Sequence, residues 1–148
     1  MRGLRSLPII QCMEALIVDP VRHNELLRST SLTGTPRELV NRVQRIVGGW
    51  YYRAMSFEYF DGDTHVATDS LWLYSGADMH EPLHYFAVSR NSIEFPFVGV
   101  GVIAGLDLKN LDLTAVHGSL DYWSARIRAI SSEQAERLRL LTLRIPRT

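Results

Sequence analysis

The 148-residue sequence lacks several features, and each absence excludes a class of protein. It has one cysteine, Cys12, so no disulfide can form within the chain, which fits a reducing compartment. It has no uninterrupted run of about 18 apolar residues, the length that a membrane-spanning helix needs. Low-complexity tracts and internal repeats are also absent. We therefore expect a cytoplasmic protein, not a membrane protein, with a single domain over residues 1–148.

The chain also lacks a net charge, because sixteen basic residues balance sixteen acidic ones. The charges are unevenly placed: residues 61–121 hold nine acidic and two basic residues, and both ends of the chain are basic. Affinity for phosphates comes from basic side chains that replace counterions, so this acidic middle segment is not expected to bind nucleic acid. We expect the basic ends to pair with it within the fold or across a homo-oligomer.

One pentapeptide, HEPLH at residues 80–84, matches the H-E-x-x-H pattern of zinc peptidases. The pattern needs a helix, where residues four apart share one face. Pro82 opposes a helix here, because an interior proline costs roughly 3 kcal/mol and biases the residue before it away from helical angles. An extended chain would hold the two histidines about 13 Å apart, too far for one ion. We predict no metal site, and keep as an alternative a loop site built from Asp78, His80, Glu81 and His84.

A second pattern, GVGVIAG at residues 99–105, is loosely similar to the glycine pattern of dinucleotide-binding proteins. That pattern binds a pyrophosphate only where a strand leads into a helix. Here the following residues, VIAGLDL, have the composition of a strand. We expect the glycines to mark a bulge or a sharp bend of a sheet, and we predict no cofactor.

The clearest secondary-structure signal is a helix that begins after Thr35. Thr35 and Glu38 form a capping-box pattern, Pro36 suits the first helical position, and the glycines at 48–49 end the helix. A shorter helix is predicted at residues 20–28, with Asp19 as its cap. The apolar residues 8–18 before it favour a strand, because they are rich in β-branched side chains.

From Trp50 onward, aromatic and β-branched residues predict strands. Residues 50–60 and 64–74 are expected to form a hairpin with its turn at Asp61 and Gly62. Two more strands are expected around a turn at residues 90–92, and Pro96 predicts that the second of them lies at a sheet edge or carries a bulge there. Residues 101–118 predict a further extended pair. The period of residues 120–130 fits both a strand and a helix; we favour a strand, followed by a helix that begins at Ser131 or Ser132.

These elements predict an α+β fold, in which a curved antiparallel sheet of about five to seven strands is packed by two N-terminal helices and a C-terminal helix. Their order is similar to the helix-grip arrangement of lipid- and polyketide-binding proteins, in which a curved sheet wraps a C-terminal helix over a cavity. The resemblance implies a helix-grip fold or a related cavity-forming α+β barrel.

The predicted hairpin supplies two sets of candidate site residues. A two-residue turn at Asp61 and Gly62 pairs Tyr59 with Thr64. One face then combines apolar area with phenols, hydroxyls and a guanidinium, as small-molecule pockets do, and its candidate ligand-binding residues are Tyr51, Arg53, Met55, Phe57, Tyr59, Thr68, Ser70 and Trp72. The other face carries the candidate catalytic residues, a base, a proton shuttle and an orienting carboxylate: Glu58, His65 and Asp69.

The function that we predict from the sequence is binding of an apolar or aromatic small molecule in a cavity between sheet and helices. Arg53 and the tyrosines would orient the polar groups of the ligand. Whether the protein is also an enzyme, of the cyclase or isomerase type, is left open. A first alternative is a protein-interaction module, similar to an immunity or adaptor protein, that uses the acidic segment 61–81. A second alternative is a metal-dependent enzyme that uses the loop at residues 78–84.

Overall fold

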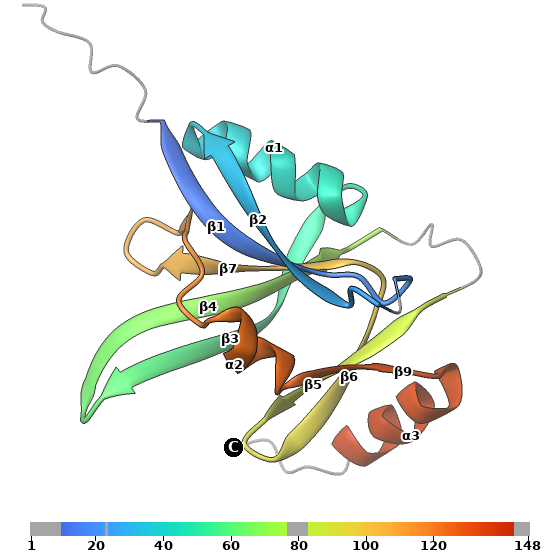
Figure 1. Cartoon of the computed structure of the whole chain (residues 1–148). Helices are drawn as coiled ribbons and strands as arrows, with labels where there is room; N and C mark the ends of the chain where they lie inside the picture. The colour runs from blue at the N-terminus through green and yellow to red at the C-terminus, as the bar shows by residue number, and fades with distance from the viewer. Residues whose placement is uncertain (1–9, 23, 77–82, 144–148) are drawn as a thin grey trace, which may run out of the picture.

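The computed structural model describes residues 10–22, 24–76 and 83–143. Within these residues the chain forms two antiparallel sheets and three helices (Figure 1). The first sheet has the order β2-β1-β7-β4-β3, with β8 beside β7, and its strands are β1 (Gln11–Val18), β2 (Leu27–Gly34), β3 (Tyr51–Asp61), β4 (Thr64–Tyr74), β7 (Gly101–Asp107) and β8 (Asp112–Thr114). The second sheet has the order β6-β5-β9, with strands β5 (Tyr85–Arg90), β6 (Ile93–Val98) and β9 (Ile127–Ile130). The predicted α+β class and its antiparallel sheet are confirmed.

A turn and the first two residues of β2 stand where a helix was predicted at residues 20–28, so that prediction is wrong. Asp19 caps a turn instead of a helix: its carboxylate accepts a hydrogen bond from the backbone N–H of Val21 and pairs with Arg28 at 3.3 Å. The turn returns the chain beside β1, which pairs with β2 along all eight residues. Among the residues described before Tyr51, one helix therefore precedes the hairpin, rather than two.

The helix α1 (Pro36–Val47) forms as predicted. Thr35 and Glu38 make both hydrogen bonds of the capping box, and Gly48 ends the helix with a φ of 106°, which favours glycine. Its buried residues, Leu39, Val43 and Val47, pack with Val102 and Ala104 of β7. The helix therefore covers one face of the first sheet.

The hairpin of β3 and β4 has a different register from the predicted one. Its turn is at Gly62 and Asp63, so Asp61 pairs with Thr64. Two bulges follow. At the first, Val66 is an extra residue in β4, and at the second, Ala54 is an extra residue in β3. Between the bulges Phe57 faces Asp69 and the side-chain alternation of β4 is inverted relative to the prediction.

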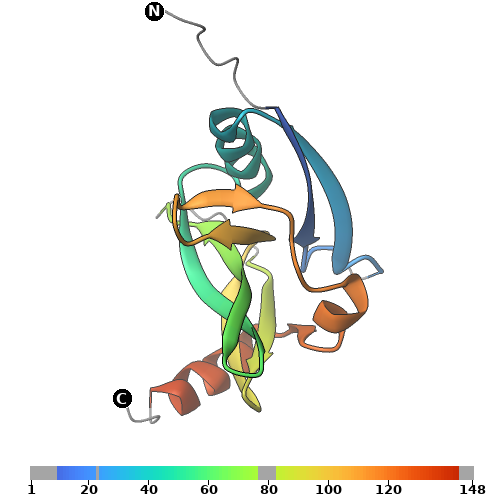
Figure 2. The same cartoon turned by 90° about the vertical axis from the view of Figure 1, so that its left-hand side faces the viewer.

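The second sheet carries the C-terminal helix α3 (Ser132–Thr142). Asn91 and Ser92 have positive φ angles in the tight turn between β5 and β6, and Pro96 lies in the edge strand β6, both as predicted. Ser131 caps α3, also as predicted. Figure 2 shows α3 against the second sheet, on the opposite side of the molecule from α1. The helix-grip arrangement is not confirmed, since α3 packs on β6 and β5 rather than across the first sheet.

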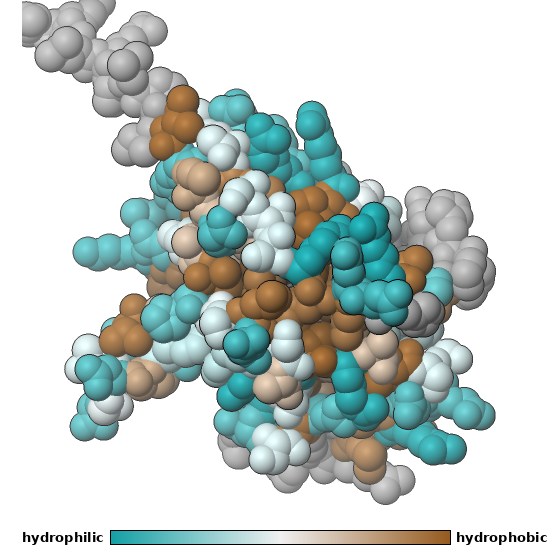
Figure 3. Space-filling model, viewed as in Figure 1, coloured by the Kyte–Doolittle hydropathy of each residue, from teal (hydrophilic) through white to brown (hydrophobic). Residues whose placement is uncertain are grey.

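The two sheets meet around a core centred on Trp123 of the short helix α2 (Leu120–Ser124), the helix that stands where a strand was favoured. Trp123 and Phe86 are fully buried there together with Leu71 and Ile103. The glycine at position 101 leaves room for Leu71 and Phe86 to pack here, because a side chain at that position would touch both. Figure 3 shows hydrophobic residues gathered at the centre of the same view as Figure 1. Among the described helices, none has the length and hydrophobicity to cross a membrane.

Candidate functional site

The eight candidate ligand-binding residues do not share one face, so that part of the prediction is wrong. Met55 and Phe57 belong to the core around Trp123. Tyr51 and Trp72 pack together, 5.1 Å between ring centroids, on the α1 side of the sheet. The physical reason is the Ala54 bulge, which moves the residues after it to the opposite face. Arg53, expected to orient a ligand from inside a cavity, is exposed.

The three candidate catalytic residues are also divided. The Nε2 atom of His65 lies 2.7 Å from the hydroxyl of Thr68, which is the cross-strand partner of Glu58. Asp69 points to the other face of the sheet, because successive residues of a strand alternate. Glu58 and His65 are exposed, whereas Asp69 is completely buried. The carboxylate therefore does not orient the imidazole.

Asp69 is instead the centre of a buried polar cluster that joins β4 to the segment before α2. Its Oδ1 atom accepts a hydrogen bond of 2.7 Å from the backbone N–H of His117. Its Oδ2 atom accepts from the hydroxyl of Tyr59 at 2.7 Å and from the backbone N–H of Gly118 at 2.9 Å. The indole N–H of Trp123 lies 3.4 Å from the same oxygen. We call these five residues the Asp69 cluster.

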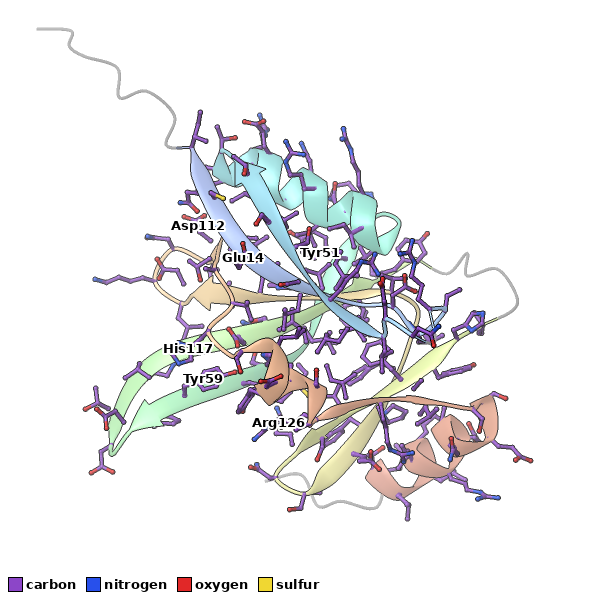
Figure 4. All side chains as sticks on the ribbon, viewed as in Figure 1. Glu14, Tyr51, Tyr59, Asp112, His117 and Arg126 are labelled. Carbon is purple, nitrogen blue, oxygen red and sulfur yellow. The ribbon has the colours of Figure 1, made fainter. Side chains whose placement is uncertain are left out.

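Aromatic contacts complete the Asp69 cluster. The rings of Tyr59 and His117 are 4.5 Å apart between centroids, and Figure 4 shows the two side chains together beside β3 and β4. Burial and the neighbouring carboxylate of Asp69 raise the pKa of the Tyr59 hydroxyl far above its ordinary value. Tyr59 is thus a fixed hydrogen-bond donor at neutral pH. With four donors on one carboxylate, Asp69 holds the chain together and is poorly placed to take a proton from a ligand.

The acidic segment proposed for a protein partner is not one surface. Asp61 and Asp63 are exposed at the tip of the hairpin, and Asp69 is buried. Asp78 and Glu81 lie outside the described residues, as does His80 of the HEPLH motif. The alternative of a metal site at residues 78–84 therefore stays a prediction.

A cleft that can hold a small molecule opens between the two sheets and α3, and we call it the α3 cleft. Its volume is about 320 Å³. It is lined by the ends of β3 and β4 that lie away from their turn, by β5 and β6, and by α3. The lining residues are Tyr52, Leu73, Tyr74, Tyr85, Pro96, Phe97, Val98, Ser132, Ala135, Glu136 and Arg139. None of the eight candidate ligand-binding residues is among them. The cleft residues were missed because they come from five separate segments, and among them only the tyrosines carry a recognisable signal.

The chemistry of the α3 cleft is apolar at the floor and polar along the rim. Leu73 and Ala135 are buried, and Tyr52 is 48% exposed. On α3, Arg139 donates two hydrogen bonds to Glu136, of 2.6 and 3.0 Å. These bonds lower the pKa of the Glu136 carboxyl, so it is ionised at neutral pH and is a poor general acid. The geometry fits binding better than acid–base chemistry.

Comparison of the chain with protein-family models, with curated proteins and with solved structures finds no match. The function is therefore inferred from the geometry of the site alone.

Proposed function

We propose that the protein binds a small, largely apolar molecule in the α3 cleft. The observation that carries the proposal is the combination of an apolar floor, made by Leu73, Pro96 and Phe97, with two phenols beside it, from Tyr52 and Tyr85. Ligand sites typically combine a mostly hydrophobic lining with a few polar groups that fix orientation, in volumes of about 300–1,000 Å³. The α3 cleft is at the small end of this range, which favours a compact ligand with one or two polar groups.

Packing of the surrounding elements supports a cleft that exists before the ligand arrives. Leu73 is held in the core between the sheets, and Tyr85 and Val98 are cross-strand partners in β5 and β6. On the other wall, Ala135 anchors α3 against Ala87 and Ile130. A site whose walls are already ordered loses less conformational entropy on binding.

The proposal is one of binding rather than of a cyclase or isomerase reaction. Catalysis would require an acid–base group with a suitable pKa at the ligand. The carboxylate in the α3 cleft is Glu136, which Arg139 already holds in an ion pair. A phenol hydroxyl can donate and accept a hydrogen bond, so Tyr52 and Tyr85 fit the role of orienting groups.

A neutral hydrophobic probe tests the proposal directly. We expect ¹⁵N-labelled protein titrated with N-phenyl-1-naphthylamine to show saturable amide shifts at residues of β6 and α3. Ser132→Trp places an indole in the cleft from an exposed position and should abolish these shifts. Arg137→Trp is the matched control, because Arg137 is exposed on the same helix and does not line the cleft. Saturable shifts that persist in Ser132→Trp, or their absence from the wild-type protein, would contradict the proposal.

A further inference from the structure

A second hollow, separate from the α3 cleft, lies at the far end of the second sheet, and we call it the arginine hollow. Its volume is about 620 Å³. Parts of β3, the end of β5 with its turn, and α2 with the segment after it line the hollow. The lining residues are Ser56, Phe57, Glu58, Phe60, Ser89, Arg90, Asn91, Tyr122 and Arg126. It shares no residue with the α3 cleft.

Aromatic rings hold both arginines of the arginine hollow in place. The guanidinium of Arg126 lies 3.6 Å from the centre of the Tyr122 ring and donates a hydrogen bond to the carbonyl of the same residue. The guanidinium of Arg90 lies 5.5 Å from the ring of Phe95 and 6.0 Å from that of Phe57. A backbone hydrogen bond from Ser89 to Arg126 ties the two segments together. The two cations are thus positioned by the fold before any ligand binds.

The charges of these two arginines are not balanced within the described part of the chain. Arg90 and Arg126 each donate one hydrogen bond to a backbone carbonyl, of Ser56 and Tyr122, and neither forms an ion pair among the described residues. Arg128, two residues further on, makes a bidentate ion pair with Glu94. A guanidinium has five N–H donors, so most donors of Arg90 and Arg126 remain available to a ligand.

From this arrangement we infer that the arginine hollow is a binding site for a small organic anion. The head group of the ligand is a carboxylate or a phosphate, since both accept paired hydrogen bonds from a planar guanidinium. The body of the ligand is flat and apolar, because Phe60 and Tyr122 line the hollow and the ring of Phe60 is 57% exposed. The carboxylate that lines the hollow is Glu58, which leaves one net positive charge in its wall.

The test uses phenyl phosphate, benzoate and neutral benzyl alcohol as probes, at low ionic strength, with amide shifts of ¹⁵N-labelled protein as the readout. We expect saturable shifts at Ser89, Asn91 and Tyr122 with one or both anions and not with benzyl alcohol. Tighter binding of phenyl phosphate than of benzoate identifies a phosphate ligand, and the reverse order identifies a carboxylate. Failure of both anions to bind, or equal binding of benzyl alcohol, overturns the inference.

Three substitutions make the test specific to the two arginines. Arg126→Gln and Arg90→Gln should each weaken anion binding about tenfold, the equivalent of one charge-assisted contact. Glu58→Gln removes the opposing charge at an exposed position and should tighten binding about twofold. The matched control is Arg128→Gln, whose guanidinium is already paired with Glu94 and should leave binding unchanged. Arg90 is exposed, so Arg90→Gln should fold and still tests the inference if Arg126→Gln does not fold. Equal affinities in wild type and Arg90→Gln would overturn the inference.

Discussion

The hydroxyl of Tyr59 and the carboxylate of Asp69 are joined by a hydrogen bond of 2.7 Å between neighbouring strands. The bond forms only because the bulge at Val66 brings the two side chains to the same face of the hairpin. Through Asp69 it extends to the backbone N–H groups of His117 and Gly118, which are 48 and 49 residues away in the chain. The Asp69 cluster therefore fixes α2, and with it the junction between the two sheets.

Asp69→Asn tests how much the protein depends on this cluster. The side-chain NH₂ of asparagine is itself a donor, so it cannot accept the hydrogen bonds that one carboxylate oxygen of Asp69 accepts. The donors that bind this oxygen would stay buried without an acceptor. We expect the free energy of unfolding to fall by roughly 2–4 kcal/mol. Urea denaturation followed by tryptophan fluorescence measures the loss. Asp61→Asn, at the exposed tip of the same hairpin, should change stability by less than about 0.5 kcal/mol. Equal effects of the two substitutions would show that the cluster does not stabilise the fold.

Tyr59→Phe has a predicted pH dependence. Near neutral pH it removes a hydrogen bond to a carboxylate and should cost about 2 kcal/mol. The pKa of Tyr59 is raised in the folded protein above its ordinary value of 10.0, so the stability that its hydroxyl contributes is complete below pH 10. Above that pH the unfolded state gains by ionising, and the advantage of the wild type should shrink by up to about 1.4 kcal/mol per pH unit. Denaturation curves from pH 7 to pH 11 measure this change. A constant difference between wild type and Tyr59→Phe across that range would contradict the assignment.

Gly118→Ala should disrupt the same cluster by crowding. A Cβ atom at residue 118 would lie 2.6 Å from the Tyr59 hydroxyl and 2.5 Å from the indole nitrogen of Trp123. We expect a loss of roughly 1–3 kcal/mol in the free energy of unfolding. In a Tyr59→Phe background the close contact with the hydroxyl is absent, so the same substitution should cost less. A double-mutant cycle of the two positions measures this coupling, and strict additivity would argue against the contact.

The helices α1 and α3 should respond differently when their caps are removed. Thr35→Ala should lower the free energy of unfolding by about 1 kcal/mol, because α1 buries three residues and is part of the main core. Ser131→Ala should loosen α3 locally, since Ala135 is the residue that this helix buries. Hydrogen exchange of the amides in α3 would then accelerate with little change in global stability. A loss of global stability in Ser131→Ala as large as that in Thr35→Ala would contradict this distinction.

The sequence predicted correctly those structural features that depend on a few neighbouring residues. The capping box of Thr35 and Glu38, the turn before Ile93 and the edge position of Pro96 all depend on residues close in sequence. The helix predicted at residues 20–28 failed because Asp19 caps a turn as readily as a helix. Residues 27–34, LRSTSLTG, pair with β1 along their full length. Their composition did not indicate a strand.

The site was harder to predict because it depends on register. One extra residue at Val66 and one at Ala54 decide which side chains share a face, and neither residue carries a signal for a bulge. Tyr59 and Asp69 were both identified as site residues, but on opposite faces. Arg90 and Arg126 come together only through the pairing of β5 with β9, which is a contact between distant parts of the chain.

Native mass spectrometry of the protein purified from its source tests the proposed binding function most directly. We expect the wild-type protein to retain one small molecule, detected as a discrete added mass. The Ser132→Trp protein should lack that mass, because the indole fills the α3 cleft, and Arg137→Trp should keep it. A wild-type protein that carries no added mass, or a Ser132→Trp protein that carries the same mass, would contradict the proposal that the α3 cleft is a ligand site.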